Sequence, residues 1–150
     1  MDRKSFMIGA AGSVAASLLP TTSRAATGRQ RDFTQFCDLF YRQKRVRDAF
    51  VAQVAPEYIQ HSAGMAQGRE AAIIALEPMF SRPTFQIVPL RMLWDGNLAS
   101  VILDVSVGPE VRAIVIDIYR FAGIRIVEHW DVKAELGTQQ RAGYFDGFRN

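Results

Sequence analysis

Residues 111–132 read VRAIVIDIYRFAGIRIVEHWDV and carry the strongest strand signal in the chain. β-Branched and aromatic residues dominate this segment, which favours strands at 111–121 and 125–132. Ala122-Gly123-Ile124 separates them, so the two strands are predicted to pair as a hairpin. Residues two apart share a face of a strand, and both faces of 111–121 are apolar. We therefore expect helices to cover one face of the sheet and a second subunit to cover the other, giving a homodimer.

Two more strands are predicted immediately before this hairpin. Alternating apolar residues over 85–94 indicate a strand with an irregularity near Pro89. Asp95-Gly96 is a strong hairpin signal, and the strand that follows runs from Ala99 to Val107. The four predicted strands form an antiparallel meander.

Helical patterns occupy the region before the strands. Aromatic residues and one cysteine follow Asp32 at helical spacing: Phe33, Phe36, Cys37, Phe40 and Tyr41. Asp32 and Gln35 resemble a helix-capping pair. The helical pattern continues over 46–54, Pro56 suits the first turn of another short helix, and 69–76 reads as a helix that ends or kinks at Pro78. Helices followed by a meander predict an α+β fold with the helices packed on one face of the sheet.

The first 26 residues have the three-part pattern of a secretory signal peptide. Arg3 and Lys4 precede an uncharged run over 7–19, Pro20 ends the run, and Ser23-Arg24-Ala25 supplies small residues for cleavage. The run is too short to span a bilayer as a stable helix, so no stable membrane anchor is expected. The start, residues 2–7, resembles a twin-arginine export signal in which lysine replaces the second arginine. A general secretory signal is the alternative, and both routes predict a bacterial periplasmic or secreted protein.

Removal of the leader leaves a nearly neutral protein. The whole chain has 18 basic and 15 acidic residues, and residues 1–26 hold three of the basic and one of the acidic, which leaves 15 against 14. No basic stripe remains to suggest a nucleic-acid partner. Cys37 is the only cysteine, so no internal disulfide is possible. We divide the chain into a signal peptide (1–26), one domain (27–135) and a C-terminal tail (136–150).

Three polar side chains stand in strands that are otherwise apolar. His129 and Asp131 are two residues apart and share a face. A three-residue loop at 122–124 would place Asp117 opposite His129, whereas a two-residue loop would place it next to Glu128 or Trp130. Alternatively, Asp117 points outward or pairs with an arginine such as Arg120 or Arg125.

If the three side chains converge, they predict proton-transfer chemistry. A carboxylate in an apolar cavity has its pKa raised toward neutrality, and a histidine can hold or pass a proton. Such groups suit proton transfer at a carbon next to a carbonyl. A metal site built from His61, His129 and Asp131 is only weakly indicated, because no close ligand spacing supports it. A polar cluster with a purely structural role is the alternative.

Four segments together resemble the SnoaL-like polyketide cyclase group of the nuclear transport factor 2-like superfamily. They are Tyr58-Ile59-Gln60-His61, Gly68-Arg69-Glu70, Asp117-Ile118-Tyr119-Arg120 and Ile126-Val127-Glu128-His129-Trp130-Asp131. The resemblance covers roughly residues 33–133. It implies a cone-shaped α+β fold, with helices packed on a strongly curved antiparallel sheet around a pocket, and a homodimer. It also implies acid/base chemistry without metal or cofactor, with the catalytic carboxylate at Asp131 and its partner position at Asp117, where the cyclases often have histidine.

These observations predict a cofactor-independent acid/base enzyme of the SnoaL-like group, of the aldol, cyclase or isomerase type. Its ligand would be a small apolar carbonyl compound. Asp131 is the expected base, and Asp117 and His129 are expected to tune or relay the proton. Tyr58, His61 and Trp130 are expected to line the pocket. A non-catalytic periplasmic small-molecule-binding protein and an accessory dimerisation module are the alternatives.

Overall fold

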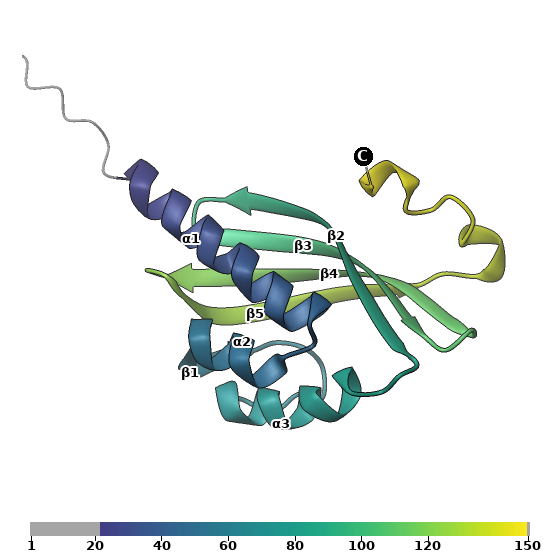
Figure 1. Ribbon diagram of the computed structural model, residues 1–150, viewed down its shortest axis with the longest axis horizontal. Helices are drawn as coiled ribbons and strands as arrows, with labels where there is room; N and C mark the ends of the chain where they lie inside the picture. Colours follow the sequence, from purple (N-terminus) through teal and green to yellow (C-terminus); the bar gives the residue numbers. More distant parts are fainter. Residues whose placement is uncertain (1–21, 150) are drawn as a thin grey trace, which may run out of the picture.

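The protein is an α+β structure in which the helices cover one face of a five-stranded sheet (Figure 1). We describe a computed structural model, which covers residues 22–149, with side chains from residue 28. The predicted signal peptide therefore lies largely outside the described residues. The helices are α1 (Thr22–Cys37), α2 (Val46–Gln53) and α3 (Arg69–Phe80), and a π-helical turn, η1 (Asp38–Arg42), continues α1.

The sheet has the strand order β1-β5-β4-β3-β2. Its strands are β1 (Val54–Gln60), β2 (Phe85–Asp95), β3 (Leu98–Val107), β4 (Val111–Ala122) and β5 (Arg125–Glu135). The four predicted strands form the expected antiparallel meander, and the irregularity near Pro89 is a register shift between Pro89 and Arg91. The hairpin at Asp95-Gly96 is also present, with Gly96 at φ 58°.

The fifth strand, β1, corrects the helix that the sequence predicted at Pro56. Residues 54–60 are extended and pair in parallel with β5, with Gln60 opposite His129. Proline is tolerated here because β1 lies at the edge of the sheet, where a missing N–H costs no ladder hydrogen bond. The strand is decisive for the site, because it directs Tyr58 and Gln60 to the helix-covered face.

The aromatic stripe of α1 forms the centre of the core, as its spacing predicted. Phe33 and Phe36 are fully buried, and the Phe33 ring lies edge-on to Trp94, Tyr119 and Phe121 at centroid distances of 5.2–5.3 Å. The predicted capping pair is not at a helix start, because α1 begins at Thr22, ten residues before Asp32. Helix α3 likewise continues past Pro78 to Phe80.

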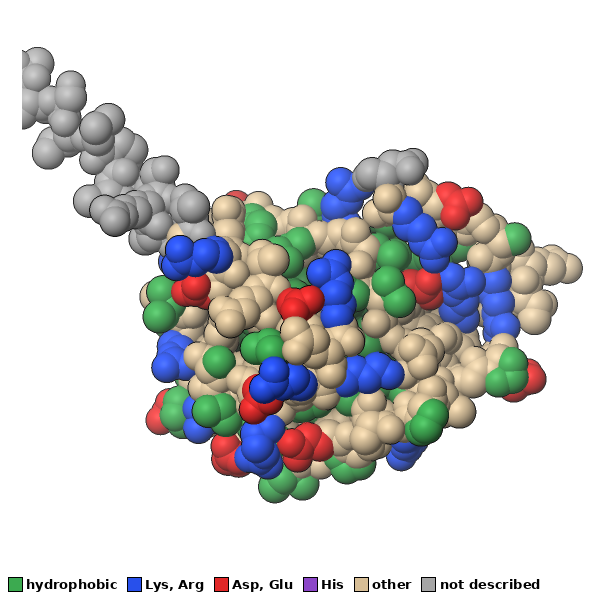
Figure 2. Space-filling view, in the orientation of Figure 1, with side chains coloured by type: hydrophobic (Ala, Val, Ile, Leu, Met, Phe, Trp, Pro, Cys, Tyr) green, Lys and Arg blue, Asp and Glu red, His purple; other side chains and the backbone are tan. Residues whose placement is uncertain are grey.

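The C-terminal tail packs against the far side of the sheet. It contains two 3₁₀ turns, η2 (Thr138–Gln140) and η3 (Asp146–Phe148). Phe145 is buried beneath the Arg112 guanidinium, 5.0 Å from the ring centroid, and Arg149 lies 3.2 Å from the Asp104 carboxylate. On the face that Figure 2 shows, basic and acidic side chains are interspersed.

Candidate active site

A cavity of about 630 Å³ lies between the helices and the inner face of the sheet. Its walls are largely apolar and come from β2, β3, α3 and η1, with Ile87, Leu103, Val105, Leu76, Met79 and Phe40 among the lining residues. Alternate residues of β4 and β5 supply a polar wall. This position, between a curved sheet and its covering helices, is typical of a small-molecule site.

The turn between β4 and β5 has two residues, as one of the two alternatives assumed, but the register farther along the strands differs from both. The connection is a two-residue turn, Gly123-Ile124, with Gly123 at φ 60° and Ala122 paired with Arg125. A register shift then follows between Arg120 and Phe121, because β5 carries one extra residue there. As a result Asp117 lies opposite Asp131, and not opposite His129 or beside Glu128 or Trp130.

The extra residue also explains which side chains share the cavity. Directly opposed residues of an antiparallel pair point to the same face, so Asp117 and Asp131 lie together, as do Tyr119 and His129. All four line the cavity. The structure therefore brings together Asp117, His129 and Asp131, the three side chains that the sequence singled out.

The Asp117 carboxylate is buried and lies among the side chains of Tyr41, Tyr119 and His129. The Tyr41 hydroxyl donates to Oδ2 at 2.6 Å, and the Tyr119 hydroxyl lies 3.4 Å from the same oxygen. His129 Nε2 lies 3.3 Å from Oδ1. Tyr41 and Tyr119 also bond to each other, at 2.5 Å. Asp117 thus points inward, and not outward to an arginine.

Tyr41 is a site residue that the sequence analysis treated only as part of the apolar stripe. It lies in η1, where the π-helical turn widens the end of the α1 helix and Tyr41 reaches β4 across the core. One signal could have revealed it, since a tyrosine within a buried aromatic stripe needs a hydrogen-bond partner for its hydroxyl.

The hydroxyls around Asp117 stay protonated. Burial raises the pKa of Tyr41 and of Tyr119 well above the ordinary value, and the charge of Asp117 raises both further. Burial also raises the pKa of Tyr58, with a further contribution from Asp117. The cavity therefore contains three phenol groups that act as donors across the whole physiological range.

His129 continues the polar cluster toward β1. Its Nδ1 lies 2.8 Å from Gln60 Oε1, and Gln60 Nε2 donates to the Tyr58 hydroxyl at 3.1 Å. Gln60 belongs to the motif segment Tyr58-Ile59-Gln60-His61 but was not singled out as a site residue, because an uncharged amide carries no signal of its own. Tyr58 lines the cavity, as predicted.

Asp131 differs from Asp117 in having a free carboxylate. It lines the cavity and is only partly buried, and within residues 28–149 its side chain has no hydrogen-bond or ion-pair partner. Lys133 and Glu135 follow it along the same face of β5. An unpaired carboxylate beside a group of protonated phenols can accept a proton from a bound molecule.

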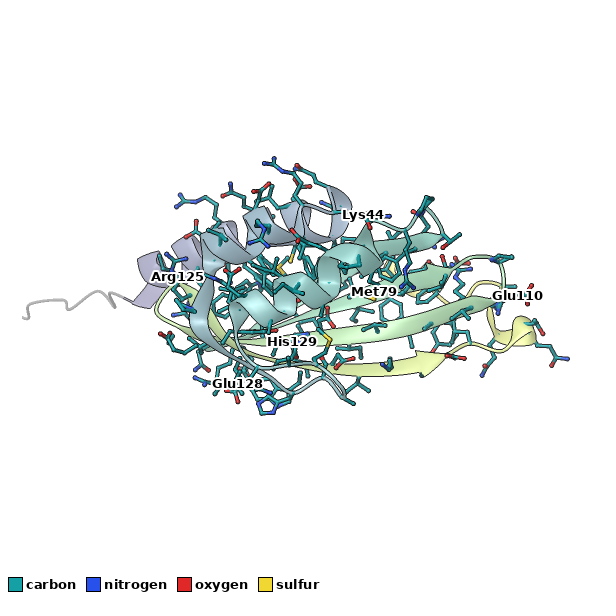
Figure 3. The ribbon with its side chains drawn as sticks, turned by 90° about the horizontal axis from the view of Figure 1, so that it is seen from below. Lys44, Met79, Glu110, Arg125, Glu128 and His129 are labelled. Atoms are coloured by element: carbon teal, nitrogen blue, oxygen red, sulfur yellow. The ribbon has the colours of Figure 1, made fainter. Side chains whose placement is uncertain are left out.

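His61 and Trp130 were expected at the pocket, but neither lies among the residues that line it. Their rings stack at a centroid distance of 4.8 Å on the other side of the sheet, where His61 Nε2 lies 2.7 Å from Glu128 Oε1. Figure 3 shows Glu128 on the side of β5 away from the helices. Hydrogen bonds from His61 and Arg120 lower the pKa of Glu128. Trp130 is absent from the cavity because side chains alternate along a strand: it lies between His129 and Asp131, which face the cavity, and so must face outward.

The same alternation rules out the weak metal-site alternative. His61 lies on the opposite side of the sheet from His129 and Asp131, so these three cannot converge on one ion. Over the part of the chain that the structure describes, no other group of three potential ligands is placed to hold a metal.

Comparison with known proteins agrees with this architecture. Residues 33–129 match the SnoaL-like domain family. No curated protein sequence matches the chain. Among solved structures, an LEH-like epoxide hydrolase from M. tuberculosis aligns with a TM-score of 0.56 and 18% identity, over 72% of this chain and 84% of that protein.

Two further structures have related folds. A candidate ketosteroid isomerase from Kribbella flavida DSM 17836 aligns with a TM-score of 0.58 and 17% identity, over 76% of this chain and 81% of that one. A candidate SnoaL-like polyketide cyclase from Jannaschia Sp. CCS1 aligns with a TM-score of 0.56 and 17% identity, over 69% and 85%. At these identities the comparisons show a shared fold.

The chain thus has the nuclear transport factor 2-like fold, with a largely apolar cavity that has a polar wall on β4 and β5. Because the family match covers most of the chain, the protein belongs to the SnoaL-like family.

We predict that Tyr41→Phe lowers the free energy of unfolding by about 1–3 kcal/mol, because it removes a buried donor from Asp117 and an acceptor from Tyr119. Urea denaturation at pH 7 measures the change. Tyr144→Phe is the matched control, since Tyr144 is exposed and its loss of a hydroxyl should change stability by less than about 0.5 kcal/mol. Equal losses of stability in the two variants would contradict the hydrogen bonds assigned to the Tyr41 hydroxyl.

The stability of the wild-type protein and that of Tyr41→Phe should also depend differently on pH in alkaline solution. A tyrosine whose pKa is raised by folding stabilises the protein fully below about pH 10, and this contribution is lost as the pH rises further, because the unfolded chain ionises first. Tyr41→Phe lacks one such group. The stability difference between wild type and Tyr41→Phe should therefore narrow above pH 10.

Proposed function

We propose that this protein is a cofactor-independent acid/base enzyme that acts on a small apolar carbonyl compound, in an aldol, cyclase or isomerase type of reaction. The observation that carries the proposal is the unpaired Asp131 carboxylate, which faces a largely apolar cavity beside the buried cluster of Asp117, His129, Tyr41 and Tyr119. The cyclase and isomerase descriptions of structures with this fold agree with such chemistry.

The proposed reaction begins with removal of a proton from the carbon next to the carbonyl group. Asp131 accepts the proton, and the electrons of the broken C–H bond move into an enolate whose negative charge is on the carbonyl oxygen. A donor must stabilise that charge. Tyr58 fits this role, because Gln60 donates to the Tyr58 oxygen and, among the described residues, no group accepts the Tyr58 proton.

Asp117 and His129 support the groups that contact the ligand and do not react with the ligand themselves. Both nitrogens of His129 face protein atoms, and both oxygens of Asp117 have protein neighbours. Their role is therefore to stabilise charge within the cluster and to keep the neighbouring side chains in position. Asp131 receives no hydrogen bond from this cluster and stays available as a base.

A binding protein with the same cavity is the alternative. Its polar wall would orient a ligand through Tyr58 and Asp131 without proton transfer. The two functions differ in one measurable property, exchange of carbon-bound hydrogen with solvent.

We also propose that the protein forms a homodimer through the outer face of the sheet. Apolar side chains that are at least partly exposed occupy the middle of this face: Ile114, Ile116, Ile118, Trp130 and Val132. Val132 is 61% exposed, and the C-terminal tail contacts this face at Arg112 and Asp104. An exposed apolar surface of this kind favours association.

For the cellular location, we propose export to the periplasm or outside the cell, by the twin-arginine route. The support is the leader pattern in residues 1–26. Within residues 22–149, no helix has the length and apolarity needed to cross a membrane.

We predict that Asp131→Asn slows deuterium exchange into small ketones by about 10²–10⁴-fold, the usual contribution of a positioned acid/base group. Cyclohexanone, 1-tetralone and 2-decanone in D₂O are the probes, followed by proton NMR. Glu135→Gln is the control, since Glu135 lines the same cavity from the same strand. Probes that bind without exchange would support the binding protein, and equal rates in both variants would contradict the role of Asp131.

For the dimer, sedimentation of the mature protein at micromolar concentration should give twice the monomer mass. Val132→Lys places a charge at the centre of the outer face and should yield monomers. Val51→Lys introduces the same charge at a similarly exposed site on α2 and should leave the dimer intact. A wild-type monomer would contradict the proposal.

For export, N-terminal sequencing of periplasmic protein should find a first residue between Ala25 and Gly28. Replacement of Arg3 and Lys4 together should retain the protein in the cytoplasm. Periplasmic protein that begins at Met1 would contradict cleavage, and export blocked only by inhibition of the general secretory route would contradict the twin-arginine assignment.

A further inference from the structure

Gln60 lies at the junction of three structural elements and contacts each of them through its side-chain amide. Its Oε1 lies 2.8 Å from His129 Nδ1 and 3.0 Å from the backbone nitrogen of Ser62, and its Nε2 lies 3.1 Å from the Tyr58 hydroxyl. Gln60 is buried, and it pairs with His129 in the register of β1 and β5. Every polar atom of this side chain is therefore in use.

The backbone of Ser62 determines which way the amide of Gln60 points. A backbone N–H can only donate, so the side-chain atom of Gln60 that faces Ser62 must be the oxygen. The same oxygen faces His129 Nδ1. Because an amide oxygen can only accept, His129 must carry a proton on Nδ1.

His129 Nε2 faces Asp117 Oδ1 at 3.3 Å and is buried, without a hydrogen-bond partner that satisfies its geometry. With Nδ1 protonated, a neutral ring would direct a lone pair at a carboxylate oxygen, which is repulsive. One proton must therefore lie between His129 and Asp117, on either atom, and Tyr41 and Tyr119 hold the remaining oxygen of Asp117.

We infer that Gln60 is a positioning residue, which directs the hydrogen bonds of the whole cluster. It makes His129 donate from Nδ1, so that the His129–Asp117 pair keeps a proton, and it occupies the Tyr58 oxygen, so that the Tyr58 proton is directed to a ligand. This inference rests on the proposed function for its purpose, but the proton positions follow from the geometry alone.

Nitrogen-15 NMR of the two histidines tests the inference without any ligand. The chain has only His61 and His129, and chemical shifts distinguish protonated from unprotonated ring nitrogens. At neutral pH we expect His129 to be protonated at Nδ1. His61 is an internal contrast, because its Nε2 faces the Glu128 carboxylate and must be the protonated nitrogen.

Three variants distinguish an effect of the Gln60 side chain on the His129 proton from an effect of a less stable loop. Gln60→Met removes the acceptor, so the proton should leave Nδ1 of His129 and the ring should donate from Nε2 to Asp117. Gln60→Glu keeps an acceptor and should keep Nδ1 protonated. Gln67→Ala is the matched control, since Gln67 bonds the backbone N–H and carbonyl of Gln60 but not its side chain. It loosens the same loop and should leave the His129 spectrum unchanged.

The outcomes are distinguishable from those of the proposed function. An unprotonated Nδ1 in the wild-type protein, an unchanged spectrum in Gln60→Met, or the same change in Gln67→Ala would overturn the inference. If Gln60→Met does not fold, the wild-type spectrum and Gln60→Glu still decide it. If the proton is where we expect but Asp131→Asn keeps full exchange activity, the function is wrong and the role of Gln60 stands.

Discussion

The burial of the Asp117 carboxylate is the constraint on which the site depends. A carboxyl group enclosed by apolar side chains is costly unless donors surround it. Here the Tyr41 hydroxyl from η1 donates to it, and Tyr119 from β4 itself and His129 from β5 lie beside it. Because these groups come from different elements, the end of α1, the sheet and the cavity are mutually dependent.

That dependence extends to β1 through Gln60. The second nitrogen of His129, Nδ1, faces Gln60 Oε1, which is in reach because β1 pairs in parallel with β5 at this point. The strand also carries Tyr58, whose hydroxyl faces the cavity. The edge strand β1 thus supplies both Gln60, which contacts His129, and Tyr58, which faces the cavity.

The two faces of the sheet serve different purposes. The inner face has a polar wall on β4 and β5 opposite an apolar wall on β2 and β3, which suits a ligand with a polar group on an apolar body. The outer face carries Ile116, Trp130 and Val132 around a small set of ion pairs, such as Arg120 with Glu128. Because this fold supports many unrelated activities, its function must be argued from Asp131 and the groups beside it.

Much of this arrangement could be predicted from the amino-acid pattern. Strand alternation identified β2 to β5, helical spacing identified the aromatic stripe of α1, and the two-residue period placed His129 and Asp131 on one face. These features are local, since they depend on residues a few positions apart. The four motif segments also pointed to the SnoaL-like family, because their order and spacing can be read directly from the sequence.

The position of Asp117 opposite Asp131 could not be predicted, because one extra residue in β5 shifts the register and no local pattern marks it. Tyr41 and Gln60 were missed, since each gains its role only from a partner at least 69 residues away. His61 and Trp130 were misplaced for a related reason, because which face of a strand becomes the cavity depends on where the helices pack. Periodicity along the chain specifies which residues share a face, but long-range pairing and burial determine which face becomes the site.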